Sequence, residues 1–457
     1  MAAATGVALS AAEAGFAGRY ARSLLRALDI AAEPKASIDS PALANARCGL
    51  QALTGPGDAS PRMPPAPLSS CAQGALAALA ALPGGAALAG LDAAALLGER
   101  AACNGLSRAG DISPGGGCRL LACADGWLAV QLSREDDWAL LPAWLEDESV
   151  SDWEGLSRVL RQCAAAPLAE RAALLGLAAA DCVPPRAPTA WYRRLVRAPR
   201  RVDTSVRPPL VLDMSSLWAG PLCSHLLQAM GARVIKLESR QRPDGARTGN
   251  AEFFDLLNAG KECVALDFGS AEGIDQLRAL IARADIVIEA ARPRALKQLG
   301  IDAERCVAEQ PGLSWISLTG YGREGEAGMR AAYGDDAGAA AGLAWMMACA
   351  HGAPGFVGDA IADPLTGLHA ALCAWSAWLD GEGGLWSLPL RDVVAHCIAS
   401  AGDNSPAAVR ARAGAWQAEI EAAGVTAQPP RARRPAGRAG ALGADTQRVL
   451  ENLVASC

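Results

Sequence analysis

An aspartate before an apolar helical run is the residue of this chain best suited to chemistry. Asp363 opens the segment DPLTGLHAALCAW. A carboxylate there can cap a helix by accepting backbone N–H bonds. It can also be a nucleophile that forms a mixed anhydride with an acyl group and divides one transfer into easier steps. Asp359 and the pair Asp335–Asp336 compete for a carboxylate role.

Basic residues follow several predicted strands. They are Lys236, Arg247, Lys261 and Arg292. One lysine at a strand end is usually only solvated, but several around one sheet edge suit a polyanionic ligand, because they neutralise phosphates. The loop SSLWAGPLCSHLL enters a helix near Gly220, and free N–H groups at a helix start bind phosphate or carboxylate. This loop lacks the GxGxxG pattern, which disfavours a nicotinamide dinucleotide.

The elements that must position these residues alternate along the chain from about residue 210. Short β-branched runs are separated by helical periods, at 209–214, 233–238, 263–268, 285–290 and 313–320. This alternation predicts an α/β fold with a Rossmann-like parallel sheet. Ligands of such sheets bind beyond the carboxyl ends of the strands. We therefore expect a site in the loops after Met214, Glu238, Ala290 and Gly320.

The first 200 residues have a different composition and a different pattern of expected elements. Ala- and Leu-rich helical sequence is followed by a hairpin pattern at 113–132, with a turn at Gly115–Gly117 and an Asp-Gly turn at Asp125. We expect the hairpin to belong to a smaller α+β domain and to cover the site. The predicted divisions are 1–100 (helical), 101–197 (small α+β domain), 198–209 (linker), 210–400 (catalytic domain) and 401–457 (closing segment).

A weak internal repeat relates the two halves. Shifting the chain by 293 residues places Gly49 on Gly342, Pro61 on Pro354 and Gly74 on Gly367. Chance similarity of Ala-rich sequence is the alternative. A true repeat makes residues 1–100 a degenerate copy of part of the catalytic domain. This copy has Ser70 in place of Asp363, so we expect one active site per chain.

Composition excludes several classes of protein. The 457 residues are 51% hydrophobic with a net charge of −6, which argues against a disordered chain and against nucleic acid as a partner. The most apolar stretch, 75–95, is interrupted by proline, glycine and aspartate, so we expect no membrane span. The N-terminal sequence lacks a signal-peptide pattern, and we expect a cytoplasmic protein. The 14 cysteines include no CxxC pair and the four histidines no HxxxH pair, so we expect no metal site.

Several motifs together resemble the family III CoA-transferases, also called the CaiB/BaiF family. In order they are VLDMSSLWAGPLCSHLLQAMGARVIKLE, FFDLLNAGKECVALDF, ADIVIEAARPRALKQLGI and LSWISLTGYGREGE. The resemblance runs from about Pro208 to Leu390 and resumes at 422–431 and 443–453. The segment SPGGGCRLLACADGWLAV resembles the start of the family's small domain. Here it precedes the large domain, which suggests a rearranged or partly duplicated chain.

The resemblance implies roles for individual residues. Asp363 falls on the family's nucleophile. The CoA-binding positions fall on Lys236, Lys261, Arg292, Gly320, Tyr321 and Gly322. Racemase relatives use a His-Asp pair, but this chain has Gly334-Asp335 at that place and so lacks the histidine.

The implied activity is transfer of CoA from an acyl-CoA to a small carboxylic acid, through an aspartyl anhydride and an enzyme–CoA thioester. CoA and acyl-CoA would be substrates, with no permanently bound cofactor, and the protein would be a homodimer. Backbone N–H groups near Gly358 or Gly367 are candidates for stabilising the oxyanion. The alternatives are an acyl-CoA isomerase or racemase, which needs a general base, and a non-catalytic CoA-binding subunit.

Overall fold

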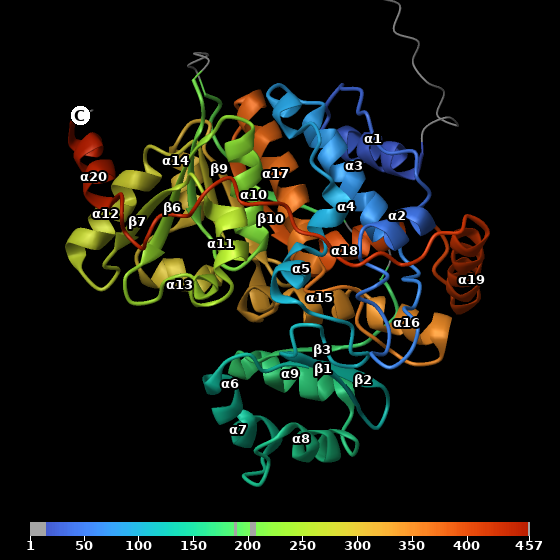
Figure 1. The fold of residues 1–457 in the computed structure, drawn as a ribbon. Helices are drawn as coiled ribbons and strands as arrows, with labels where there is room; N and C mark the ends of the chain where they lie inside the picture. Colours follow the sequence, from blue (N-terminus) through green and yellow to red (C-terminus); the bar gives the residue numbers. More distant parts are fainter. Residues whose placement is uncertain (1–14, 187–189, 202–206, 456–457) are drawn as a thin grey trace, which may run out of the picture.

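The computed structural model describes residues 15–186, 190–201 and 207–455. Figure 1 shows a central sheet with its helices, a layer of N-terminal helices beside it, and a smaller lobe that projects from both. The chain between α19 (Pro406–Ala422) and α20 (Thr446–Ala455) crosses the molecule from the N-terminal layer to the far edge of the sheet.

The main sheet has seven strands. They are β4 (Arg193–Arg197), β5 (Leu210–Met214), β6 (Arg233–Ser239), β7 (Glu262–Leu266), β8 (Ile286–Glu289), β9 (Ser314–Thr319) and β10 (Gly384–Pro389). Their spatial order is β4-β10-β9-β8-β5-β6-β7, and every pair is parallel except β4 with β10. The predicted α/β class with a mainly parallel sheet is confirmed. The strand order reverses between β5 and β8.

Both faces of this sheet are covered, which explains its continuous apolar strands. Val211 and Ile286 belong to the core shared with α10 and α17, whereas Leu212 and Val287 belong to the core shared with α12, α14 and α20. The sheet's helices are α10 (Ala219–Ala229), α11 (Ala251–Asn258), α12 (Ala271–Ile281), α13 (Pro293–Gln298), α14 (Ala303–Glu309), α15 (Gly334–Ala340), α16 (Leu343–His351), α17 (Ala362–Asp380) and α18 (Leu390–Ala399).

Two strands of this sheet differ from the sequence prediction. Strand β4 lies at one edge and pairs with β10, although residues 193–197 were expected in the small domain. Its sequence RRLVR is rich in charge because an edge strand faces solvent. Strand β10 was not expected at all, since glycine and proline at its ends weaken a strand pattern.

The small lobe is built on the predicted hairpin. Strands β1 (Cys118–Ala122) and β2 (Trp127–Gln131) pair antiparallel, and β3 (Ala178–Asp181) joins β2 to complete a three-stranded sheet. Trp144 is buried in the core of this lobe. The lobe's helices are α6 (Glu135–Ala139), α7 (Leu141–Leu145), α8 (Trp153–Leu160) and α9 (Ala165–Leu175).

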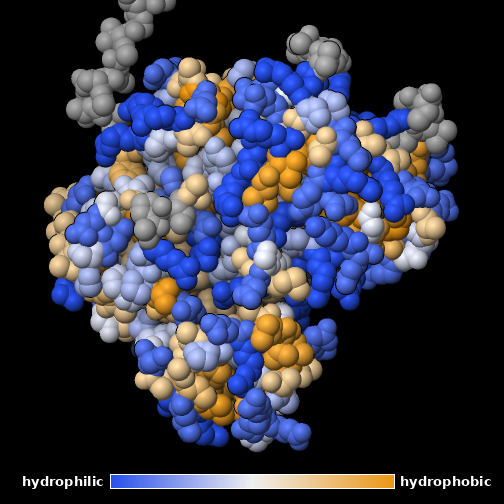
Figure 2. Space-filling view, turned by 180° about the vertical axis from the view of Figure 1, so that it is seen from behind, coloured by the Kyte–Doolittle hydropathy of each residue, from blue (hydrophilic) through white to orange (hydrophobic). Residues whose placement is uncertain are grey.

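The N-terminal layer is helical and shares one hydrophobic core with α10 and α17. Buried Tyr20 is hydrogen-bonded through its hydroxyl to Nε2 of His369, at 2.8 Å. The layer consists of α1 (Phe16–Ala27), α2 (Pro41–Arg47), α3 (Leu68–Ala80), α4 (Ala93–Leu96) and α5 (Glu99–Asn104). Figure 2 shows a mostly hydrophilic surface with apolar residues in small patches. Among the helices that the structure describes, none is long and apolar enough to span a membrane.

Candidate active site

Asp363 lies where the first residues of three helices meet. It is the second residue of α17, whose N-cap is Ile361, so its position lies inside the helix rather than at the cap. The backbone N–H of Ala219, at the start of α10, donates a hydrogen bond to its carboxylate. Gly334, the first residue of α15, packs directly against the same carboxylate. Helix N-termini attract negative charge, so this arrangement favours a carboxylate.

Asp363 lines two cavities. The first, of about 240 Å³, also contains Arg292, Gly320 and Ser216. It lies beyond the carboxyl ends of β5, β8 and β9, at the point where the strand order reverses and where sheets of this kind bind ligands. A neighbouring cavity of about 510 Å³ shares Ser216 with it and continues past the ends of β6 and β7.

The second cavity beside Asp363, of about 300 Å³, is built from all three parts of the molecule. Arg100 comes from the N-terminal layer, Gln131 and Ser133 from the end of the hairpin, and Phe253 from α11. The hairpin thus lies over Asp363, as expected. Gly117 in its glycine turn is close to Gln131 and Ser133, where a Cβ would lie 2.7 Å from each polar group.

The carboxylates around Asp363 are buried and interact strongly. Burial raises the pKa of Asp363 to about 7, although nearby Arg100 lowers it. Burial, reinforced by Asp359, raises the pKa of Asp335 to about 7, and burial raises that of Asp336 to about 8. Asp363 is therefore partly ionised near neutral pH. Within the described part of the chain, no group of His, Cys, Asp or Glu side chains is arranged to hold a metal ion.

The predicted CoA-binding residues fall into two groups. Arg292 and Gly320 line the first cavity. Tyr321 is 5% exposed, with the guanidinium of Arg330 4.0 Å from its ring centre. Gly322 has a φ of 126°, and its N–H donates to the hydroxyl of Thr319. The loop after β9 therefore presents Gly320 to the cavity and buries its tyrosine.

Lys236 and Lys261 lie inside the protein rather than on a cavity wall. The Lys236 ammonium is 2.8 Å from a carboxylate oxygen of Asp244, and that of Lys261 is 3.1 Å from one of Asp213. Burial lowers the pKa of Lys261 to about 8, whereas the two lysines overcome the effect of burial on Asp213 and lower its pKa to about 2. Neither ammonium group lies on a cavity wall, so the structure does not show the direct contact with CoA that the sequence predicted.

Both backbone sites suggested for the oxyanion are already occupied. The N–H of Gly358 donates to the hydroxyl of Thr54. Gly367 lies inside α17 and packs against α10, where a Cβ would be 2.7 Å from the carbonyl oxygen of Ala219. The close packing of α17 against α10 therefore explains why residue 367 is a glycine.

Arg100 was missed by the sequence analysis. Its guanidinium binds both carboxylate oxygens of Asp359, at 2.8 and 2.5 Å, and it also lines the cavity of Asp363. A single arginine 263 positions before Asp363, in helical sequence, offers no pattern that could have identified it.

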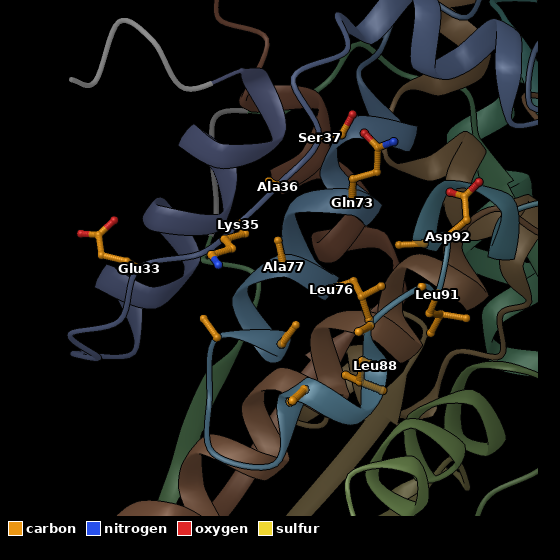
Figure 3. A pocket seen from close by; sticks show the side chains of 17 residues that line it. Glu33, Lys35, Ala36, Ser37, Gln73, Leu76, Ala77, Leu88, Leu91 and Asp92 are labelled. Carbon is orange, nitrogen blue, oxygen red and sulfur yellow. The ribbon is translucent and has the colours of Figure 1, made fainter. Parts of the chain in front are cut away.

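Another cavity, of about 660 Å³, lies in the N-terminal layer and contains none of the predicted site residues. Figure 3 shows Gln73, Leu76 and Ala77 of α3 on its wall, with Lys35 and Asp92 nearby. Its walls belong to residues 33–93, away from the carboxyl edge of the sheet.

The segment that contains this site is similar to known proteins. Residues 209–400 match the model of CoA-transferase family III. The succinate–glutarate CoA-transferase of Agrobacterium fabrum is 28% identical over 215 residues, covering 42% of this chain and 54% of that protein. The succinyl-CoA–D-citramalate CoA-transferase of Chloroflexus aurantiacus is 31% identical over 185 residues, covering 39% and 45%.

A solved structure of a CaiB/BaiF family protein from Brucella suis is 26% identical, covering 51% of this chain and 59% of that one, with a TM-score of 0.37. The chain spans about half the length of the curated relatives it matches. The segment that matches the model of CoA-transferase family III, residues 209–400, contains strands β5 to β10 and Asp363.

Proposed function

We propose that this protein is an acyl-CoA:carboxylate CoA-transferase with Asp363 as its nucleophile. The observation that carries the proposal is the position of the Asp363 carboxylate, on the wall of both cavities. One cavity lies at the sheet edge, and the other beneath the hairpin. A carboxylate placed between a CoA site and an acid site can exchange groups with both.

In the proposed reaction, an ionised oxygen of Asp363 attacks the carbonyl carbon of the acyl-CoA. The carbon–sulfur bond breaks, CoA leaves as a thiolate, and a mixed anhydride joins Asp363 to the acyl group. The thiolate then attacks the aspartyl carbonyl, which releases the first acid and leaves an enzyme–CoA thioester. The acceptor carboxylate attacks this thioester, and the thiolate released attacks the acyl carbonyl of the new anhydride, giving the new acyl-CoA and free Asp363.

CoA would occupy the cavities at the sheet edge in a Rossmann-like manner. Arg292 supplies positive charge for a phosphate, and Gly320 lets the ligand approach the backbone. Tyr321 and Gly322 would shape this loop. Lys236 and Lys261 would support the CoA site from the interior without touching CoA. Lys236 bonds to Asp244 on the wall of the 510 Å³ cavity, and Lys261 bonds to the carbonyl of Pro221 in α10.

The acid would enter the second cavity, where Arg100, Gln131 and Ser133 offer hydrogen-bond donors. The relatives are named for dicarboxylic and hydroxy acids, so succinyl-CoA with glutarate or citramalate is the first pair to try. Three further parts of the proposal come from the sequence. CoA acts as a substrate with no resident cofactor, the protein is a homodimer, and it is cytoplasmic.

The test is substitution of Asp363 by Asn and by Ala, with Asp380→Asn at the other end of α17 as the control. Both variants at 363 should bind CoA, lose transfer, and form no enzyme thioester that hydroxylamine can trap. The control should retain both activities. Full transfer by the two variants would remove Asp363 from the mechanism. Deuterium uptake at the α-carbon of a branched acyl-CoA without transfer would instead indicate an isomerase or racemase, and CoA binding without any turnover a non-catalytic subunit.

A further inference from the structure

The 293-residue offset found in the sequence recurs in the helices of the structure. Shifted by 293, α2 coincides with α15 from first to last residue, and α3 begins one residue before α17. Helix α5, shifted by the same 293 residues, falls within the bounds of α18. The packing also corresponds, because α2 lies against α3 as α15 lies against α17. At a different offset, 202 between Ala17 and Ala219, α1 lies against α3 as α10 lies against α17. We call residues 16–104 the first repeat.

The first repeat has none of the acidic residues of the Asp363 site at the corresponding positions. Asp335, Asp336, Asp359 and Asp363 correspond to Ala42, Leu43, Ala66 and Ser70. Within the described residues 15–104, no strand corresponds to the sheet that α17 packs against. The cavity along α3 in Figure 3 lies beside Gln73, Leu76 and Ala77, whose counterparts on α17 are fully buried. The first repeat is therefore unsuited to the same chemistry.

The first repeat nevertheless holds the loop that leads into Asp363. Thr54 accepts a hydrogen bond from the N–H of Gly358 at 3.3 Å. Arg100 binds Asp359 through two nitrogens, at 2.8 and 2.5 Å. The Asp359 side chain is fully buried, and a buried carboxylate needs a paired cation. Both contacts join residues more than 250 positions apart.

The backbone of this loop needs such support. Gly358 and Ala360 have φ angles of 69° and 43°, and the second is a conformation that residues with a side chain rarely adopt. The carbonyl of Ala360 accepts from the N–H of Asp363 at 2.9 Å, and its N–H donates to Asp335 at 2.8 Å. A shift of the loop would thus move Asp363 and Asp335 together.

We propose that Arg100, carried by the first repeat, is a positioning residue of the Asp363 site. By holding Asp359 it fixes the strained loop 358–361 and keeps the carboxylate of Asp363 aligned between the two cavities. The first repeat has lost the acidic residues of a site of its own and supports the remaining one. This inference rests on the proposed function of Asp363.

The charges give the proposal a distinctive signature. Arg100 lowers the pKa of Asp363, whereas Asp359 raises it. Loss of Arg100 should therefore move the acid limb of the pH–rate profile to higher pH, and loss of Asp359 should move it to lower pH. A pair whose charges do not reach Asp363 would move neither limb, and the loss of kcat at constant KM reports the alignment itself.

The experiment compares Arg100→Gln, Asp359→Asn and the double variant in transfer from an acyl-CoA that the wild type accepts. Arg47→Gln, which removes an exposed pair with Asp39 in the same repeat, is the matched control. We expect Arg100→Gln to lower kcat by about 10- to 100-fold with little change in the KM for acyl-CoA, because alignment is lost but the CoA cavity is not. Arg100→Lys should restore part of the rate.

In the double variant the acid limb should return toward the wild-type position, because both opposing charges are gone, while kcat stays low. Unshifted limbs in both single variants, or a double variant with full kcat, would overturn the proposal. A wild type that forms no trappable thioester would instead refute the transferase assignment, so the two failures are distinguishable. Thermal unfolding of each variant identifies any loss that is due only to unfolding.

Discussion

Gly74 of α3, in the first repeat, and Gly367 of α17 each make the same kind of close contact with a neighbouring helix. A Cβ at Gly74 would lie 2.7 Å from the carbonyl oxygen of Ala17, and one at Gly367 would lie 2.7 Å from that of Ala219. Each glycine lets its helix approach the neighbouring helix at close range. The two pairs have the same geometry, but only the second adjoins the carboxylate of Asp363.

This relationship makes the two glycines a matched pair of substitutions. Gly74→Ala and Gly367→Ala should each lower the free energy of unfolding by about 1–3 kcal/mol, because a packed interface must open. Only Gly367→Ala should also reduce kcat, since it pushes on Ala219, whose N–H binds Asp363. Urea unfolding and transfer rates measured on both variants check this. Equal effects on kcat would contradict it.

The pH–rate profile should report the ionisation of Asp363. Only the ionised carboxylate attacks a thioester, and its pKa is about 7. The kcat/KM should therefore fall about tenfold per pH unit below about pH 7. Asp335→Asn should move this limb to lower pH, because the charge of Asp335 raises the pKa of Asp363. A limb that stays near pH 4 in the wild type would show that another group, or none, is being titrated.

Asp336 should make the free energy of unfolding fall as the pH rises. In the folded protein it keeps its proton up to about pH 8, whereas an unfolded aspartate loses it near pH 4. The folded state binds the extra proton between these values, so the free energy of unfolding falls with pH by up to about 1.4 kcal/mol per unit from this group. Asp336→Asn removes this contribution, and its stability relative to the wild type should rise from pH 5 to pH 8. A constant difference in urea unfolding would exclude the effect.

Lys261 should matter to the fold more than to CoA affinity. Its ammonium donates to Asp213, Ser224 and Asn258 in the interior. Lys261→Met leaves Asp213 buried without its partner, which should cost about 3–5 kcal/mol. Adding Asp213→Asn should recover part of this loss. Calorimetric titration with CoA on folded protein at low temperature provides the second measurement, and a large loss of affinity with unchanged stability would restore the CoA-contact assignment.

The sequence predicted the part of the fold that has local patterns. Strands β5 to β9 appear as apolar runs between helical periods, and the structure places them within two residues of the expected bounds. Asp363 could be proposed as the nucleophile because it opens an apolar helical run in the sequence and falls on the position that the family resemblance implies. Strand β4 could not be predicted, because a charged edge strand has no buried-strand pattern. Strand β10 is buried inside the sheet, but the glycine and proline at its ends weaken its strand pattern.

The electrostatic arrangement of the site could not be predicted in the same way. Lys236 follows a strand pattern whether its ammonium faces a ligand or the interior, and only the position of Asp244 decides between them. Arg100 reaches the site because α5 packs beside α11, far along the chain. Contacts between distant segments depend on tertiary packing, which leaves no periodic signal in the sequence.

Removal of residues 1–200 should abolish folding as well as activity. Those residues include β4 at the edge of the sheet and helices α1 and α3, which cover α17. They also carry Tyr20, whose hydroxyl is bonded to buried His369, and Trp191, which is 1% exposed. A fragment of residues 201–457 would expose this apolar surface, so we expect it to be insoluble or inactive when expressed alone. Co-expression with residues 1–200 should restore soluble protein if the two parts reassociate. A soluble and fully active fragment would show that the N-terminal half is an independent appendage.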